Sequence, residues 1–242
     1  MPKKTIRKAI VTGGAKGYGG GIAKALAAAG YQVWITGRDE AALKRVARQL
    51  KVKAVRADVA SPANWDRLFA EVDAAPGRLE VLVNNAGAGI RIAPAVDQTD
   101  DEVARGLAVN LTGAIYGCTR AARRIVAGGG GTIVNISSVC ARQAWGGWGV
   151  YSAAKAGLEQ FSKCLYLEHR EQGLRVTSLA PSWGATEFTD AADLGSRPAD
   201  INRRCIQPAE LGKMVADLCA LPAHLFVQEM VIWPTIQPVE PL

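Results

Sequence analysis

The sequence predicts an α/β protein in which a parallel, doubly wound sheet lies between two layers of helices. Short apolar runs alternate with helix-like segments along the whole chain. The apolar runs are nearly continuous in Val, Ile and Leu, which is typical of strands whose two faces are both covered by helices. With 242 residues, 49% hydrophobic and 21% charged, residues 1–242 are expected to form one domain.

The elements are expected in a regular β-α order. Strands are predicted at 8–12, 32–36, 53–58, 79–87, 131–138, 174–181 and 228–234. Helices are predicted at 19–30, 40–50, 61–75, near 99–127, about 151–172 and about 208–221. Gly30 is a helix stop, and Ser61 is a candidate N-cap ahead of Pro62. The long polar segment 186–206 interrupts this order and is predicted to be a mobile lid.

The formal net charge of +7 is compatible with a nucleic-acid surface. The lysines and arginines are, however, dispersed over helices that also carry Glu and Asp. A phosphate-bearing small ligand and an ordinary solvated surface explain the charge better, so no nucleic-acid partner is expected.

The cysteines and the amino terminus favour a cytoplasmic protein. Five widely spaced cysteines contain no C-x-x-C pair, which is typical of reduced thiols. The apolar run near the amino terminus is too short for a signal sequence, and no segment is expected to span a membrane. The two histidines, His169 and His224, are far from the other candidate residues, and no metal site is expected.

A glycine-rich loop, TGGAKGYG, follows the first strand. Glycines at this spacing let the backbone turn sharply and approach a pyrophosphate at the amino end of the next helix. A tight turn without a ligand is the alternative, but the position after the first strand of a β-α series favours dinucleotide binding. The loop residues predicted to bind the cofactor are Gly13, Ala15, Lys16, Gly17, Tyr18 and Gly19.

The end of the second strand favours NADP(H) over NAD(H). A carboxylate at this position would bind the ribose 2′-hydroxyl and repel a 2′-phosphate, but the residue is Gly37. Arg38 follows it, and Lys16 supplies a second cation from the glycine loop, which together suit a phosphate group. Asp39 acts against this preference, and both cations could instead be ordinary surface residues.

Several further motifs occur in order: NNAG at 84–87, Asn110, Ser138, and Tyr151 followed four residues later by Lys155. With the glycine loop, they make the chain resemble the short-chain dehydrogenase/reductase family from about Lys4 to Pro234. The resemblance implies a Rossmann fold with a seven-stranded parallel sheet, and reversible hydride transfer between a nicotinamide and a carbonyl or alcohol. It also implies a homodimer or homotetramer.

The resemblance assigns roles to individual residues. It implies a catalytic tetrad of Asn110, Ser138, Tyr151 and Lys155. The cofactor contacts it implies outside the glycine loop are Asp58, Val59, Asn85, Ala86, Gly87, Tyr151, Lys155, Pro181, Gly184 and Thr186. In the family, the residue matching Asn110 interrupts its helix and holds a water linked to the lysine.

Tyr151 and Lys155 are one helical turn apart, so they should share a helix face. A free tyrosine has a pKa of about 10, too high for efficient acid-base work at neutral pH. The Lys155 charge and an oxidised nicotinamide ring are expected to lower that pKa. Ser138 is expected to hydrogen-bond the substrate oxygen beside the phenol.

Three positions depart from the family pattern. Tyr18 stands where isoleucine is more common, Ser182 replaces a glycine, and Gly184 replaces a branched apolar residue that often backs the nicotinamide ring. Tyr18 is expected to act mainly through its backbone and to change little, whereas Ser182 and Gly184 are expected to alter the contacts to the nicotinamide ring.

The loops expected to contact substrate are rich in aromatic residues. The candidate residues are Cys140, Arg142, Gln143, Trp145, Trp148, Trp183 and Phe188. They suggest a broad apolar or aromatic pocket in which Arg142 faces an acidic group, although the tryptophans could merely pack the lid and a subunit contact. An NADP-sensing protein without turnover is the alternative to an enzyme, and the complete tetrad favours the enzyme.

Overall fold

The fold comes from a computed structural model that describes residues 5–87, 91–188, 195 and 197–238. Seven parallel strands form one sheet in the order β3-β2-β1-β4-β5-β6-β7. The strands are β1 (Arg7–Thr12), β2 (Gln32–Gly37), β3 (Lys53–Arg56), β4 (Arg78–Asn84), β5 (Gly131–Ile136), β6 (Leu174–Pro181) and β7 (Glu229–Ile232). This arrangement confirms the predicted doubly wound fold with a seven-stranded parallel sheet.

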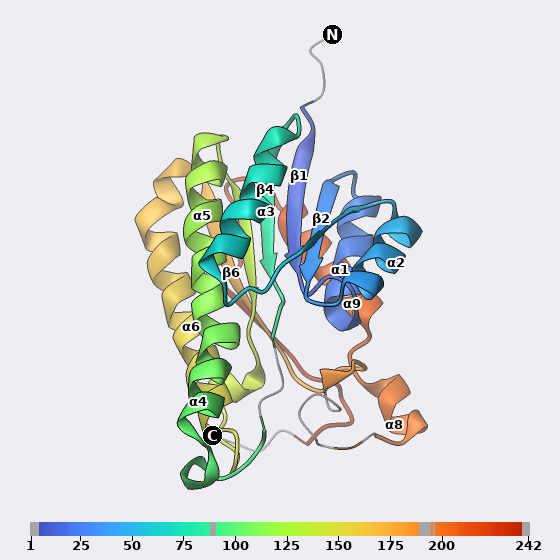
Figure 1. The fold of residues 1–242 in the computed structure, drawn as a ribbon, viewed down its shortest axis with the longest axis vertical. Helices are drawn as coiled ribbons and strands as arrows, with labels where there is room; N and C mark the ends of the chain where they lie inside the picture. The colour runs from blue at the N-terminus through green and yellow to red at the C-terminus, as the bar shows by residue number, and fades with distance from the viewer. Residues whose placement is uncertain (1–4, 88–90, 189–194, 196, 239–242) are drawn as a thin grey trace.

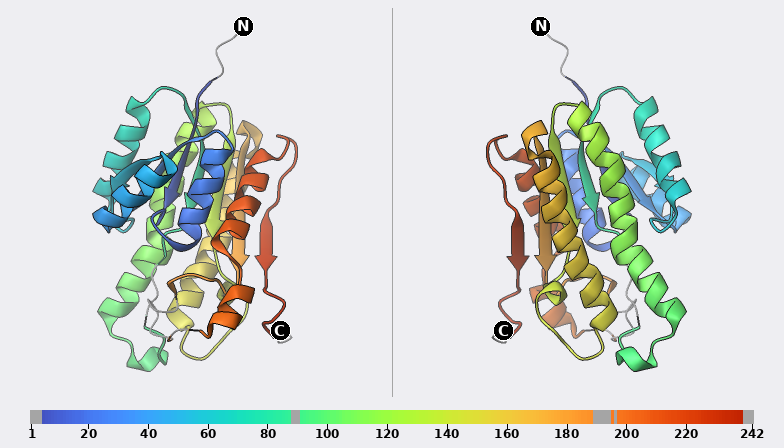
Figure 2. Two further views of the ribbon diagram at one scale, coloured as in Figure 1. Left: turned by 90° about the vertical axis from the view of Figure 1, so that its right-hand side faces the viewer. Right: turned by 90° about the vertical axis from the view of Figure 1, so that its left-hand side faces the viewer.

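Helices cover both faces of the sheet (Figures 1 and 2). On one side are α1 (Gly17–Ala28), α2 (Glu40–Leu50) and α9 (Pro208–Ala220), which bury residues such as Ile22, Leu43 and Val215 against the strands. On the other side are α3 (Pro62–Ala74), α5 (Gly113–Ala127) and α6 (Gly149–His169), which pack around Trp65 and Ile125. The two apolar cores therefore lie on opposite faces of the sheet.

Local capping fixes several helix starts. Ser61 accepts a hydrogen bond from the Asn64 amide with Pro62 in the first turn, which confirms the predicted N-cap. At the start of α4 (Asp100–Leu107), Thr99 and Glu102 form a reciprocal capping box. None of the helices in the described part of the chain combines the length and apolar character that a membrane span requires.

The long helix expected over 99–127 is interrupted in the middle. It consists of α4, a π-helical segment at Ala108–Thr112 and then α5. Asn110 lies at the centre of this segment and donates a hydrogen bond to the Gly106 carbonyl at 3.1 Å. The insertion turns the Asn110 side chain into the buried interior, and π-helical segments are frequent at functional sites.

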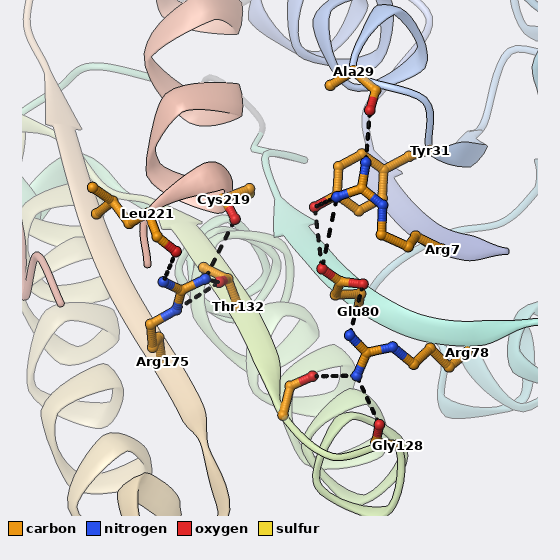
Figure 3. Close-up of polar contacts among 11 residues, drawn as sticks. Arg7, Ala29, Tyr31, Arg78, Glu80, Gly128, Thr132, Arg175, Cys219 and Leu221 are labelled. Carbon is orange, nitrogen blue, oxygen red and sulfur yellow. Dashed lines mark hydrogen bonds and ion pairs between the residues drawn. The ribbon is translucent and has the colours of Figure 1, made fainter. Parts of the chain in front are cut away.

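Cations occupy the edge of the sheet where the helices end. Helices between parallel strands run antiparallel to them, so their carboxyl ends and unpaired carbonyls gather at the amino ends of the strands. Figure 3 shows Arg7, Arg78 and Arg175 donating to the carbonyls of Ala29, Gly128 and Leu221, at the ends of α1, α5 and α9. Part of the positive charge of the chain is therefore used to stabilise helix ends.

We predict that Arg175→Met lowers the free energy of unfolding by about 1–3 kcal/mol, because Thr132 and Leu221 lose a charged hydrogen-bond donor. Urea denaturation is the measurement. Lys213→Met is the control, since Lys213 is exposed and pairs only with Asp217 on its own helix, and should change stability by less than about 0.5 kcal/mol. Equal effects of the two variants would contradict this capping role.

Candidate functional site

A cavity of about 860 Å³ opens at the carboxyl edge of the sheet. In open α/β sheets, ligands bind at this edge because the loops after the strands converge there. Most residues predicted for the site line the cavity: Gly13, Ala15, Lys16, Gly17, Tyr18, Arg38, Asp58, Val59, Asn85, Ala86, Gly87, Ser138, Cys140, Trp145, Trp148, Tyr151, Lys155, Pro181, Trp183, Gly184, Thr186 and Phe188. The volume is in the range of small-molecule and cofactor sites.

The glycine loop between β1 and α1 forms one wall of the cavity. Gly13 and Gly17 have φ angles of +64° and +50°, which residues with a Cβ atom rarely adopt. Gly19 does not line the cavity: a Cβ there would lie 2.2 Å from the Gly13 carbonyl oxygen, so this glycine lets the loop pack on its own helix. The loop thus exposes backbone at the start of α1, as a cradle for pyrophosphate requires.

Thr12 at the end of β1 holds the NNAG segment in place. Its hydroxyl accepts hydrogen bonds from the amides of Asn85 and Ala86 at 3.0 and 2.9 Å. The Asn85 side chain in turn donates to the Thr12 carbonyl at 3.0 Å. These contacts connect the ends of the neighbouring strands β1 and β4, so the distance between the glycine loop and residues 85–87 is fixed.

The glycine loop and the end of β2 each present one cation to the cavity. Lys16 and Arg38 are exposed and line it, and within the described chain neither side chain forms an ion pair. Asp39 also lines the cavity, but its carboxylate accepts a hydrogen bond from the Ala42 amide at 3.0 Å and caps α2. The Asp39 carboxylate, which acted against the expected preference for NADP(H), thus serves as the N-cap of α2.

Tyr151, Ser138 and Lys155 meet at the other end of the cavity, and all three are buried. The Ser138 hydroxyl accepts a hydrogen bond from the Cys140 amide at 3.2 Å and lies close enough to the Tyr151 phenol to lower its pKa. The Lys155 ammonium lies 5.6 Å from the centre of the Tyr151 ring and donates to the Ile136 carbonyl at 2.8 Å. The arrangement places a phenol, a hydroxyl and a cation around one point of the cavity.

Asn110 does not line the cavity but lies directly behind it. A Cβ built on Gly87 would be 3.1 Å from the Asn110 side-chain oxygen and 3.8 Å from the Lys155 nitrogen. Asn110 and Lys155 therefore both approach the backbone of Gly87. This proximity agrees with the interrupted helix and the link between Asn110 and Lys155 that the family resemblance implies.

The expected direction of the Tyr151 pKa is wrong for the chain on its own. Burial raises the pKa of the Tyr151 phenol, the nearby Cys140 thiol acts in the same direction, and the Ser138 hydrogen bond offsets only part of this. Burial also lowers the pKa of Lys155 to about 8. The Lys155 charge does not outweigh the loss of hydration around Tyr151.

Aromatic side chains surround Tyr151. Trp148 packs edge-on against its ring with centroids 5.6 Å apart, and Phe188 lies at the same distance on another side. Trp148 and Phe188 are nearly parallel to each other, with centroids 6.4 Å apart. The predicted apolar and aromatic wall is present, and Trp145 and Trp183 extend it.

The expectation for Arg142 and Gln143 is wrong, because neither residue lines this cavity. Arg142 instead forms ion pairs with Glu159 and Glu229, carboxylates that lie 17 and 87 residues away in the sequence. Arg142 and Gln143 border a separate shallow depression of about 260 Å³. The Arg142 charge is therefore used to join α6 to β7 rather than offered to a ligand.

Arg197 and Gln237 are among the cavity residues that the sequence interpretation missed. Arg197 lies over the Trp183 ring at 4.9 Å and donates to the Gly184 carbonyl at 3.1 Å. The side-chain oxygen of Gln237 accepts hydrogen bonds from the Ser182 hydroxyl and the Trp183 amide. No local motif marks Arg197, and no contact to the cavity was expected of Gln237. The lid prediction covers 186–206, of which 189–194 and 196 lie outside the described residues, and α8 (Ala199–Arg204) was not anticipated.

Comparison with known proteins defines the class. A family model described as short chain dehydrogenase matches residues 7–196. The (5R,7aS)-5-hydroxy-7a-methyl-1-oxo-2,3,5,6,7,7a-hexahydro-1H-indene-carboxyl-CoA reductase of Mycobacterium tuberculosis is 37% identical over 87% of this chain and 85% of that protein. Sulfoacetaldehyde reductase 2 of Chromohalobacter salexigens is 32% identical over 94% of both chains. The chain belongs to the short-chain dehydrogenase family of oxidoreductases.

Solved structures agree with this class. The closed form of a serine dehydrogenase complexed with NADP⁺ superposes with a TM-score of 0.88 at 26% identity and covers 97% of each chain. A metagenomic short-chain oxidoreductase in complex with NADP has a TM-score of 0.81 at 29% identity, over 96% of this chain and 98% of that one. Nicotinamide cofactors are thus bound by close structural neighbours.

We predict that Lys155 makes stability rise with pH. Since burial favours its neutral form, the unfolded chain binds more protons between pH 8 and 10, and the free energy of unfolding should increase there by up to about 1.4 kcal/mol per pH unit. The free energy of unfolding is measured by urea denaturation across this pH range for wild type and Lys155→Met, and the difference between their pH slopes is the contribution of Lys155. Lys24→Met, at an exposed position, is the control. If stability rose with pH equally steeply in Lys155→Met and in wild type, a lowered pKa of Lys155 would be refuted.

Proposed function

We propose that this chain is an NADP(H)-dependent oxidoreductase that interconverts a ketone or aldehyde and its alcohol, with Tyr151 as the general acid and base. The observation that carries the proposal is the meeting of Tyr151, Ser138 and Lys155 at one end of a cavity whose other walls include a glycine cradle and two exposed cations, Lys16 and Arg38. One cavity thus offers room for a dinucleotide and a proton-transfer group at its end.

The residues fit the cofactor at three points. The cradle of Gly13 and Gly17 would hold the pyrophosphate. Lys16 and Arg38 would pair with a 2′-phosphate, for which the capped Asp39 offers little competition. The other predicted cofactor contacts also line the cavity: Asp58, Val59, residues 85–87, Pro181, Gly184 and Thr186. When bound, NADP(H) supplies or accepts the hydride.

Tyr151 moves the proton. In the reducing direction its phenol donates to the carbonyl oxygen of the substrate, and in the oxidising direction the phenolate takes the proton back. Ser138 lies beside Tyr151, so a substrate oxygen at this end of the cavity would meet both hydroxyls. Because burial disfavours the phenolate, a positive charge at the site is needed to make Tyr151 a base near neutral pH.

Lys155 and Asn110 support the proton transfer. The Lys155 ammonium is held by the Ile136 carbonyl beside the Tyr151 ring, where its charge stabilises a developing phenolate. Asn110, turned inward by the π-helical segment, lies with Lys155 around Gly87. A water held by Asn110 would be linked to Lys155, as the family resemblance implies.

The substrate is inferred to carry an apolar or aromatic body next to its carbonyl. Trp148 and Phe188 flank Tyr151, and Trp145 and Cys140 continue the wall. The two relatives are named as reductases of a fused-ring acyl-CoA and of sulfoacetaldehyde. Their names support a reductase activity, but they do not point to a common substrate.

The remaining inferences concern the whole protein. We infer one domain over residues 1–242, a lid within 186–206 whose described part includes Phe188 and Arg197, and a cytoplasmic homodimer or homotetramer. The packing of Phe188 on Tyr151 supports a lid that closes over the site.

We predict that Tyr151→Phe lowers kcat for carbonyl reduction by at least about 10³-fold, because it removes the transferable proton and leaves the ring packing of Trp148 and Phe188 intact. Its Kd for NADPH should stay within about twofold of wild type. Steady-state kinetics and a fluorescence titration measure the two quantities. Tyr166→Phe is the matched control, since Tyr166 stacks on Phe226 away from the cavity. Substantial turnover by Tyr151→Phe would refute its role, and NADPH binding without turnover in wild type would favour a sensor.

A further inference from the structure

Tyr18 and Gly184 depart from the family pattern at positions 166 residues apart in sequence, and the structure brings them into contact. A Cβ built on Gly184 would lie 2.2 Å from the Tyr18 hydroxyl oxygen and 2.5 Å from its Cζ atom. No side chain fits at position 184 while Tyr18 keeps this conformation. The tyrosine ring thus occupies the space that a side chain at 184 would otherwise fill.

The ring, rather than the hydroxyl, is the part of Tyr18 that can meet a ligand. Tyr18 lines the large cavity, but its hydroxyl oxygen is shielded from solvent and makes no hydrogen bond within the described chain. Burial raises the pKa of this phenol, so it stays neutral. The hydroxyl is enclosed against Gly184, so a ligand in the cavity could contact only the remainder of the Tyr18 side chain.

Tyr18 and Tyr151 reach the cavity from opposite faces of the sheet. Tyr18 packs with the core under α1 and α9, where Leu211 and Ile206 lie. Tyr151 belongs to the cluster of Cys140, Trp148 and Phe188 at the start of α6. A substrate whose oxygen contacts Tyr151 must lie on the α6 side, so a flat group between substrate and Tyr18 presents its second face to the tyrosine ring.

We propose that Tyr18 is a positioning residue for the nicotinamide ring, which packs against the Tyr18 ring on the side away from the substrate, and that Gly184 is required to make room for it. This inference rests on the proposed function. Aromatic rings in such contact stabilise each other beyond simple burial of area. The ring of Tyr18 would thereby fix which face of the nicotinamide points to Tyr151.

The test compares ligands with and without the nicotinamide. The Kd of NADPH and of 2′-phospho-ADP-ribose, which lacks only that ring, is measured by calorimetry for wild type, Tyr18→Leu, Tyr18→Ala and Tyr18→Phe. We expect Tyr18→Leu and Tyr18→Ala to weaken NADPH by about five- to tenfold while 2′-phospho-ADP-ribose stays within twofold. Tyr18→Phe should bind both ligands as wild type does, and its melting temperature without ligand should rise, because an enclosed hydroxyl without a partner is removed.

The Gly184 half of the proposal has its own test. Gly184→Ala should weaken NADPH in the wild-type background, but should have little further effect in Tyr18→Ala, where the clash is gone. If Tyr18→Leu and Tyr18→Ala weakened binding of NADPH and of 2′-phospho-ADP-ribose equally, the proposal would be overturned. Tyr18 would then only stabilise the glycine loop. Unchanged NADPH binding would overturn it as well. Failure of wild type to bind either ligand would instead refute the proposed function.

Discussion

All strands of the sheet run in the same direction, and the remaining features of the molecule depend on this constraint. Parallel strands joined by helices bring the carboxyl ends of β1, β4, β5 and β6 to one edge. The glycine loop, the NNAG segment, Ser138 and the Trp183 segment follow these strands, so residues from distant parts of the sequence line a single cavity. Asn110 and Tyr151 then reach the same edge from the helices packed on the sheet.

The same constraint separates charges between the two edges. Helix amino ends point to the cavity edge, where an anion is favoured, and helix carboxyl ends point to the other edge. Arg7, Arg78 and Arg175 satisfy carbonyls at that second edge, and Lys8 does the same for Val72 and Ala75 at the end of α3. The positive charge of the chain thus divides between helix ends, surface ion pairs and the cations beside the cavity, without a nucleic-acid surface being needed to explain it.

The sequence predicted what depends on local pattern. Strand and helix order, the glycine loop and the one-turn spacing of Tyr151 and Lys155 all follow from short segments, and the structure has them in place. It could not predict Arg142, whose partners Glu159 and Glu229 come from distant elements. The raised pKa of Tyr151 was missed for the same reason, since burial results from the packing of Trp148 and Phe188 around it. The Tyr18–Gly184 contact likewise arises only when α1 and the segment after β6 pack together.

The central claim is that one cavity holds NADP(H) from Arg38 at one end to Tyr151 at the other. The most direct measurement is a titration of the purified protein with NADPH and with NADH, followed by quenching of the emission of Trp145, Trp148 and Trp183 beside the cavity. We expect quenching by both cofactors, with NADPH binding at least about tenfold more tightly than NADH and with this preference lost in Arg38→Ala. Tighter binding of NADH, or quenching by neither cofactor, would refute an NADP(H) site in this cavity.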